Sequence, residues 1–205
     1  MKCHGDNNVT TFTEISREHP QINTRLEFDI ANPSFHPVTA SGKNLSVPSL
    51  LSPYTVNSII YCTDCHNSDD NPNTGGAGPR GPHGSIYKPL LEEHYSTADF
   101  TVESSFEYAL CYKCHDRNSI LADDSFSEHK KHIEGEDAPC SVCHDAHGIS
   151  MTQGNPVNNS HLINFDINVV LPNSSGFRRF EDTGTFQGRC FLSCHGTDHN
   201  PETYP

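Results

Sequence analysis

Cys111-Tyr112-Lys113-Cys114-His115 and Cys140-Ser141-Val142-Cys143-His144 are two copies of one short motif, CxxCH. A third copy, Cys62-Thr63-Asp64-Cys65-His66, precedes them, and a longer relative, CxxxCH, spans residues 190–195. The remaining cysteine, Cys3, is also followed directly by a histidine, His4. Each pair therefore ends in Cys-His, although histidine makes up only 14 of the 205 residues. Such regularity indicates one repeated chemical site.

The spacing of the motif is that of a c-type haem attachment site. Cysteines at i and i+3 lie on the same face of a helical turn, so their thiols can form thioethers with the two vinyl groups of one porphyrin. The histidine behind the second cysteine then places its imidazole over the iron. We therefore predict covalent haem on Cys62 and Cys65, Cys111 and Cys114, Cys140 and Cys143, and Cys190 and Cys194, with His66, His115, His144 and His195 as proximal ligands.

Other uses of cysteine pairs explain the pattern less well. Zinc sites also contain CxxC, but their histidine ligands lie several residues away from the pair. A disulfide framework does not account for a histidine behind every pair. A thioredoxin-like CxxC occurs once, in a βαβ pattern that this sequence lacks.

Cys3-His4 reads as the second half of a motif whose first cysteine would stand directly before Met1. We therefore expect the chain to be the C-terminal part of a longer protein, with a fifth haem on Cys3 and His4. The alternative is an incidental free cysteine. The sequence has no apolar stretch typical of a secretory signal near its start. Because c-type haem is attached outside the cytoplasm, we nevertheless expect a periplasmic, extracellular or outer-surface location.

Nine further histidines are available as second axial ligands, against only two methionines. We therefore predict six-coordinate haems with two histidine ligands, and a low potential because methionine ligation raises it. Haems closed on both faces favour electron transfer, so we do not expect an enzyme. The distal candidates are His36, His83, His132, His147 and His161, with His129 and His199 below them and His19 and His94 last.

The composition suggests that something other than aliphatic side chains fills the interior. Hydrophobic residues make up 33% of the chain. Counting Gly and omitting Tyr, the figure is roughly 37%, against the usual ~45–50%. The net charge of −13 argues against binding to nucleic acid or to an anionic membrane surface. No apolar run approaches the ~20 residues needed to span a bilayer.

These observations predict a mostly irregular, haem-cored fold with a few short α-helices and minor β-strand. We expect a single domain over residues 1–205. It comprises an extended N-terminal part with half a motif (1–60), a three-haem core (61–150) and a C-terminal haem segment (151–205). Motif starts are 49, 29 and 50 residues apart, and the short middle step predicts a closely packed haem pair. The patterns predict helices at 89–94, 104–116 and 127–133, strands at 9–15, 26–30 and 161–170, and a hairpin at 177–187.

The stretches Ala109–Asp116 and Pro139–Gly148, with His132 between them, resemble the doubled CxxCH arrangement of multihaem c-type cytochromes. The resemblance is closest to outer-surface and extracellular members from metal-reducing bacteria, and it extends to Asn32–Pro37 and Gly81–Ser85. It covers most of the chain from residue 30 onward. The truncated first motif and the CxxxCH depart from the family pattern.

The resemblance implies respiratory electron transfer through a chain of bis-histidine haems, with His132 as a ligand. It also implies other redox proteins or extracellular electron acceptors as partners, and a homo-oligomer or filament in some members. Two alternatives stay open: a multihaem oxidoreductase with one open haem site, and a structural subunit of a cytochrome filament.

Overall fold

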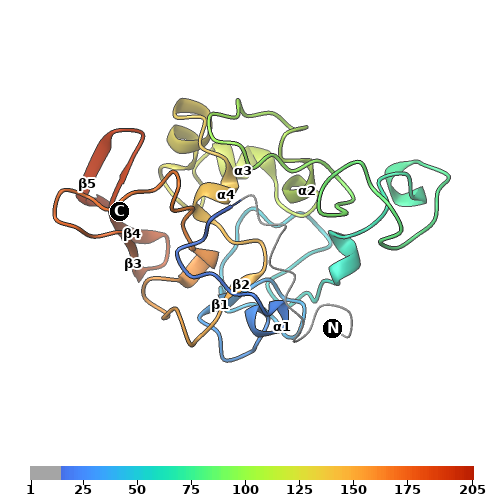
Figure 1. Cartoon of the computed structure of the whole chain (residues 1–205), viewed down its shortest axis with the longest axis horizontal. Coiled ribbons are helices and arrows are strands. Elements are labelled where there is room, and N and C mark those ends of the chain that lie inside the picture. The colour runs from blue at the N-terminus through green and yellow to red at the C-terminus, as the bar shows by residue number, and fades with distance from the viewer. Residues whose placement is uncertain (1–14) are drawn as a thin grey trace.

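The computed structural model describes residues 15–205, in which short elements interrupt mostly irregular chain (Figure 1). None of the α-helices in this part of the chain exceeds five residues: α1 (Thr24–Glu27), α2 (Ala109–Tyr112), α3 (Arg117–Leu121) and α4 (Cys140–Cys143). Three further single turns are 3-10 helices: η1 (Cys62–Asp64), η2 (Pro72–Thr74) and η4 (Ser160–Leu162). A fourth turn, η3 (Lys131–Gly135), is π-helical. No helix among the described residues has the length and apolar character required to cross a membrane.

Two antiparallel sheets accompany these turns. β1 (Ser34–Phe35) pairs with β2 (Gly148–Ile149) and so joins segments more than a hundred residues apart. β3 (Arg179–Gly184), β4 (Gln187–Cys194) and β5 (Thr197–Tyr204) form a three-stranded meander with β4 in the centre. In this sheet, Cys190 stands opposite Phe180 on one side and Glu202 on the other.

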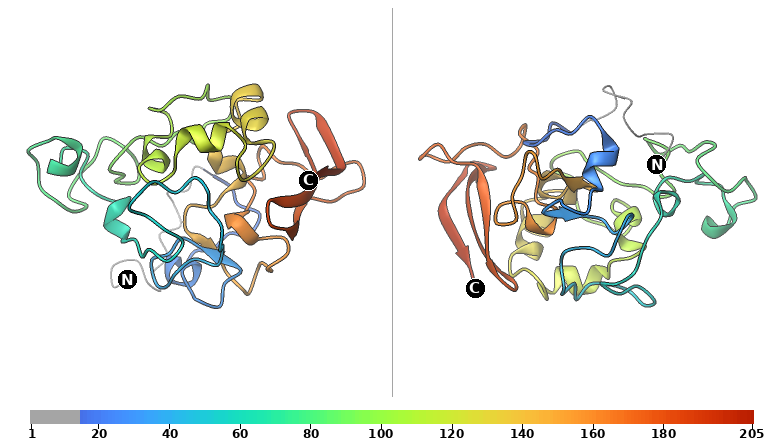
Figure 2. Two further views of the ribbon diagram at one scale, coloured as in Figure 1. Left: turned by 180° about the vertical axis from the view of Figure 1, so that it is seen from behind. Right: turned by 90° about the horizontal axis from the view of Figure 1, so that it is seen from below.

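The four cysteine motifs follow one another along the long axis of the molecule in sequence order (Figure 1). The first motif, in η1, lies toward the end from which the loop with η2 projects. The second and third motifs, at α2 and α4, lie in the middle, and the fourth is part of the sheet at the opposite end. The view from behind in Figure 2 has the same order. The fold therefore presents the motifs as a row.

The N-terminal segment lies against the second and third motifs. The backbone N–H of Leu51 donates to Cys114 O (2.9 Å), and that of Asp116 donates to Ser49 O (2.6 Å). Further upstream, the N–H of His36 donates to His147 O (2.8 Å). Residues before the first motif thus form part of the surroundings of later motifs.

The apolar core of the described residues is small. A buried cluster of Val142, Phe165, Val170, Phe180 and Leu192 lies between the third motif and the sheet, and cysteines 143, 190 and 194 pack against it. Elsewhere, large hydrophobic side chains are exposed more often than buried. The protein atoms alone therefore supply only part of an ordinary interior.

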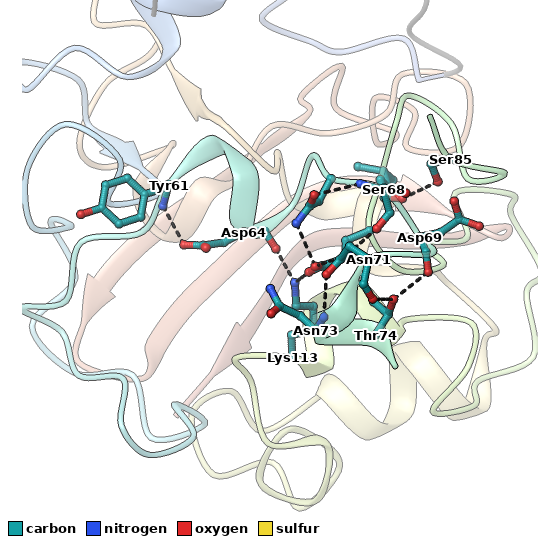
Figure 3. Close-up of polar contacts among 12 residues, drawn as sticks. Tyr61, Asp64, Ser68, Asp69, Asn71, Asn73, Thr74, Ser85 and Lys113 are labelled. Carbon is teal, nitrogen blue, oxygen red and sulfur yellow. Dashed lines mark hydrogen bonds and ion pairs between the residues drawn. The ribbon is translucent and has the colours of Figure 1, made fainter. Parts of the chain in front are cut away.

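A buried polar network joins the first two motifs (Figure 3). Glu92, which is 3% exposed, accepts hydrogen bonds from Asn67 Nδ2 (3.1 Å) and Asn71 Nδ2 (2.8 Å). It also pairs with the ammonium of Lys113, a spacer residue of the second motif. The same ammonium donates to the carbonyl of Asp64, a spacer residue of the first motif. One lysine therefore ties the two motifs to a shared buried carboxylate.

Some of the predicted elements are present. The hairpin predicted at 177–187 is confirmed, because β3 and β4 pair across this turn. The helix predicted over 104–116 is reduced to α2 and its flanking turns. The helix predicted over 127–133 begins at His129 instead, and Asp123 Oδ1, rather than a capping box at 124–128, accepts the N–H of Lys130 (2.8 Å).

Three other predicted elements are wrong. Residues 26–30 form no strand, because the side chain of Asn23 accepts the N–H of Arg25 and begins α1 there. Residues 89–94 form no helix: Leu90 has φ +63°, and Leu91 bridges to His66. Residues 161–170 form no strand, because two consecutive positive φ values, 55° and 62°, turn the chain at 161 and 162. The strand predicted at 9–15 lies, apart from Ile15, outside the described residues.

We predict that Lys113→Met destabilises the fold by about 3 kcal/mol, because it leaves the buried Glu92 carboxylate without its cation. Lys130→Met serves as the control. Its partner Glu134 lies 3.7 Å away with both side chains largely exposed, and an exposed pair contributes at most ~0.5 kcal/mol. Urea unfolding of the mature protein measures both variants. Equal losses of stability would contradict the bracing role of Lys113.

Candidate haem-binding sites

The three CxxCH motifs share one backbone geometry. In each, the N–H of the histidine donates to the carbonyl of the first cysteine: His66 to Cys62 at 2.7 Å, His115 to Cys111 at 3.0 Å, and His144 to Cys140 at 2.9 Å. This i to i−4 bond closes one helical turn, which brings the first and fourth residues onto the same side. The turn places both thiols and the imidazole where the predicted thioethers and iron bond need them.

The fourth motif has a different geometry. Cys190 and Cys194 both belong to the extended strand β4, and His195 follows it with φ +48°. Four residues of strand separate the two Cα atoms by about 13 Å, whereas a helical turn brings them close together. The Nε2 atom of His195 lies 3.0 Å from Asp99 Oδ1, and its ring stacks on Phe100. In this conformation the CxxxCH segment lacks the helical turn that the first three motifs share.

The proximal histidines of the first three motifs each have Nδ1 anchored by an oxygen. His66 Nδ1 donates to Pro89 O (3.1 Å), and His144 Nδ1 donates to His161 O (2.9 Å). His115 Nδ1 lies 3.0 Å from the buried hydroxyl of Ser49. A bond to a carbonyl oxygen makes Nδ1 the donor, so it places the lone pair of His66 and His144 on Nε2 and fixes the ring orientation, as is usual for metal-binding histidines.

Two histidine pairs have the separation of imidazoles on opposite sides of one metal. With metal–nitrogen bonds of about 2.0 Å, the centroids of two trans imidazoles are roughly 6 Å apart. The ring centroids of His66 and His147 are 6.1 Å apart, and those of His144 and His129 are 6.4 Å apart. Each pair joins one proximal histidine to a histidine outside the motifs.

The second motif has His36 as its neighbour. The charge of His36 contributes, after burial, to lowering the pKa of His115 to about 4. The Nδ1 of His36 donates to Ala146 O (2.5 Å), so its orientation is fixed in the same way as that of the proximal rings. His36 lies near both His115 and His144, whose pKa values it helps to lower, and it stays a candidate distal ligand.

Burial keeps these imidazoles neutral. It lowers the pKa of His144 to about 4 and that of His129 to about 3, and it also lowers the pKa of His36. Only a neutral imidazole can donate its lone pair to iron, so all three are able to bind a metal at neutral pH.

The other distal candidates from the sequence have different surroundings. His83 is exposed on the loop after η2. His132 stacks on Phe126, with Nδ1 donating to Glu128 O (2.7 Å). His161 has both ring nitrogens in contact with protein: Nδ1 lies 2.9 Å from Asn44 Nδ2, and Nε2 lies 3.1 Å from Asp182 Oδ2. The structure brings none of these three rings opposite a proximal histidine of the first three motifs. The predictions at Cys3 and His4 lie outside the described residues.

The thiols of the described residues form no cluster with other metal-ligand side chains. Among residues 15–205, the one group with several metal-ligand atoms within 4.8 Å of one another is Glu27, Asp145 and His147, which contains no cysteine. Burial raises the pKa of Cys65 and of Cys194 to about 11. It therefore favours the thiol, whereas zinc binds the thiolate. Thioether formation requires no such charge in the folded state.

An arginine fixes the third motif from outside. The guanidinium of Arg17 donates to Ser141 O (2.6 Å) and His144 O (2.9 Å), at the end of α4, where the helical carbonyls lack partners. It also donates to Asn164 O (2.8 Å) and lies 3.5 Å from Asp145 Oδ2. The turn of the third motif is thus held to two distant segments.

Sequence reasoning missed several of these residues. His129 ranked below His132, although both lie within one helical turn and either could face the third motif. The contacts of Arg17 and Glu27 span more than a hundred residues, and no local pattern marks them. The pairing of His66 with His147 had no sequence signal either, because it depends on how the intervening chain folds.

Comparisons with protein-family models, with curated proteins and with solved structures find no match to this chain.

Proposed function

We propose that this chain binds covalent haem at its first three motifs and transfers electrons along the row they form. The observation that carries the proposal is the repeated site: one helical turn with two cysteines and an anchored histidine, which in the first and third motifs lies beside a second histidine ring. In two of the three sites the ring separation is 6.1 or 6.4 Å. Each bound haem would supply a one-electron redox centre.

The chain's own residues bind and orient these groups. The cysteines of each turn form the thioethers, and His66, His115 and His144 are the proximal ligands. The distal ligands in the proposal are His147, His36 and His129, respectively. Because each iron then has two histidines, no coordination position is open to a substrate, which favours an electron carrier over an oxidoreductase.

Exposed apolar groups near the motifs also support a haem core. Tyr61, directly before the first motif, is 67% exposed. Burying such side chains against porphyrin faces would contribute about 25 cal/mol per Å² of apolar area. Haem faces would thereby complete an interior for which the chain has too few aliphatic residues.

The fourth motif is outside the proposed path in its present conformation. Haem on Cys190 and Cys194 would require β4 to give up its extended form over these residues. The predicted haem on Cys190 and Cys194 therefore depends on a rearrangement of β4, and the predicted fifth haem on Cys3 lies outside the described residues.

The proposed partners are redox proteins or extracellular electron acceptors, in the periplasm or at the outer cell surface. The net charge of −13, to which haem propionates would add, favours acceptors or proteins with positively charged surfaces. This charge also makes nucleic acid an unsuitable partner.

We predict that the intact mass of the mature protein exceeds its sequence mass by at least three haem groups. Peptide mapping should find thioether-linked haem on the peptides containing residues 62–66, 111–115 and 140–144. The peptide containing 190–195 serves as the internal comparison, because its state reports whether β4 opens. A protein exported with its haem-attachment machinery but lacking haem on the first three peptides would refute the proposal.

We further predict that His129→Ala opens the third site. Loss of the distal imidazole should convert one haem per chain to a high-spin form that binds one equivalent of carbon monoxide after reduction. His132→Ala is the matched control on the same helical segment, and its spectrum should stay low-spin. The reverse result would replace His129 with His132 as the ligand, and a low-spin spectrum in both variants would refute the ligation of the third site by either.

A further inference from the structure

The histidines of the three proposed sites differ in what holds their Nδ1 atoms. His147 Nδ1 donates to a carboxylate, Glu27 Oε2, at 2.9 Å. The acceptors of His66, His36 and His144 are backbone carbonyls, and His115 Nδ1 is paired with the neutral hydroxyl of Ser49. The Nδ1 of His129 is buried and has no hydrogen-bond partner. Of these histidines, one at the first site therefore has a charged acceptor, and one at the third site has none.

The fold holds Glu27 in place. Glu27 is the last residue of α1 and is 8% exposed. Its backbone carbonyl accepts a hydrogen bond from the buried Asn32 Nδ2 (2.9 Å), and the ring of the neighbouring Phe28 lies 5.2 Å from that of His147. The chain thus fixes this carboxylate against one imidazole.

A second carboxylate beside His147, that of Asp145, makes a different set of contacts. Asp145 Oδ1 accepts the backbone N–H of His147 (2.9 Å), and Asp145 Oδ2 lies near Arg17 and accepts from Asn164 Nδ2 (3.0 Å). Asp145 therefore positions the backbone, whereas Glu27 is the carboxylate that accepts the hydrogen bond of the ring.

An imidazole that donates to a carboxylate is a more basic ligand than one that donates to a neutral acceptor. A more basic axial ligand stabilises the oxidised iron more than the reduced iron, so the reduction potential falls. Without any acceptor the imidazole is the weakest donor of the series. By this reasoning, the potential rises from the first site to the third.

We propose that Glu27 is a positioning residue that gives the first site the lowest potential of the three, so that electrons run downhill from Cys62–His66 toward Cys140–His144. The inference rests on the proposed function, because it needs haem at these motifs. It gives electron transfer a direction, and it attributes that direction to Glu27, a residue outside every motif. One electron passes from each centre to the next, and no proton transfer is required.

Glu27→Gln tests this inference, because it keeps the side-chain volume and removes the negative charge. A redox titration monitored by electron paramagnetic resonance of the low-spin haems resolves the centre that is reduced last. In the variant, the oxidised-to-reduced ratio of this centre at a fixed potential should fall about tenfold, equivalent to about 59 mV for one electron. Its signal should also change shape, since the axial ligand itself is altered. The other two centres should stay unchanged.

Glu103→Gln is the matched control. Glu103 is a buried carboxylate close to the second motif, but it accepts from Arg117 Nε (2.8 Å) and Tyr112 OH (2.9 Å) rather than from an imidazole. Its replacement should leave all three resonance signals unchanged in shape. An equal effect of both variants would assign the shift to charge at a distance and overturn the ligand mechanism.

The outcomes separate this inference from the proposed function. Absence of haem in the unchanged protein refutes the function. Haem present at all three motifs, with an unaltered titration of the last-reduced centre in Glu27→Gln, refutes the inference alone. If the Glu27→Gln protein loses one haem, the Glu27→Asp variant is measured instead. Its shorter side chain weakens the hydrogen bond, so a smaller shift in the reduction potential of the same centre is expected. An unshifted centre in Glu27→Asp overturns the inference.

Discussion

In each of the first three motifs, the hydrogen bond from the histidine N–H to the carbonyl of the first cysteine is the constraint on which the structure depends. It forms in η1, at α2 and at α4, and it turns three short sequences into three equivalent sites. Because both cysteines and the histidine of each turn face the site, the two spacer residues are left to connect it to the rest of the chain. Lys113 reaches Glu92 and Asp64, and Tyr112 donates to Glu103. The backbone of Ser141 accepts from Arg17.

Hydrogen bonds and ion pairs therefore join segments that a hydrophobic core usually holds together. Glu92 and Arg17 each contact at least three partners, and both join segments that are distant in sequence. A buried ion pair is a weak source of net stability, but the loss of one partner is costly. Networks of this kind define which segments meet even where few apolar side chains are available to select the contact.

The sequence alone predicted the local features and not the distant ones. The motif turns and the hairpin at 177–187 depend on neighbouring residues, so their spacing and turn chemistry were sufficient to predict them. The strand expected at 26–30 was wrong because one side chain, Asn23, begins a helix that the alternation of apolar residues did not indicate. The pairing of His66 with His147, and the contact of Glu27 with His147, arise only when the N-terminal segment folds back along β1 and β2.

In the proposed function, the ligand pairs would also impose an order on how the sites are completed during export of the chain. His36 precedes the second motif and His129 precedes the third. The distal histidine of each of these two sites would therefore already be exported when the turn of its motif forms. The first motif must wait for His147, 81 residues further on (147 − 66). The site with the anchoring carboxylate is therefore the last of the three to close. Until then, its iron would be the one accessible to small exogenous ligands.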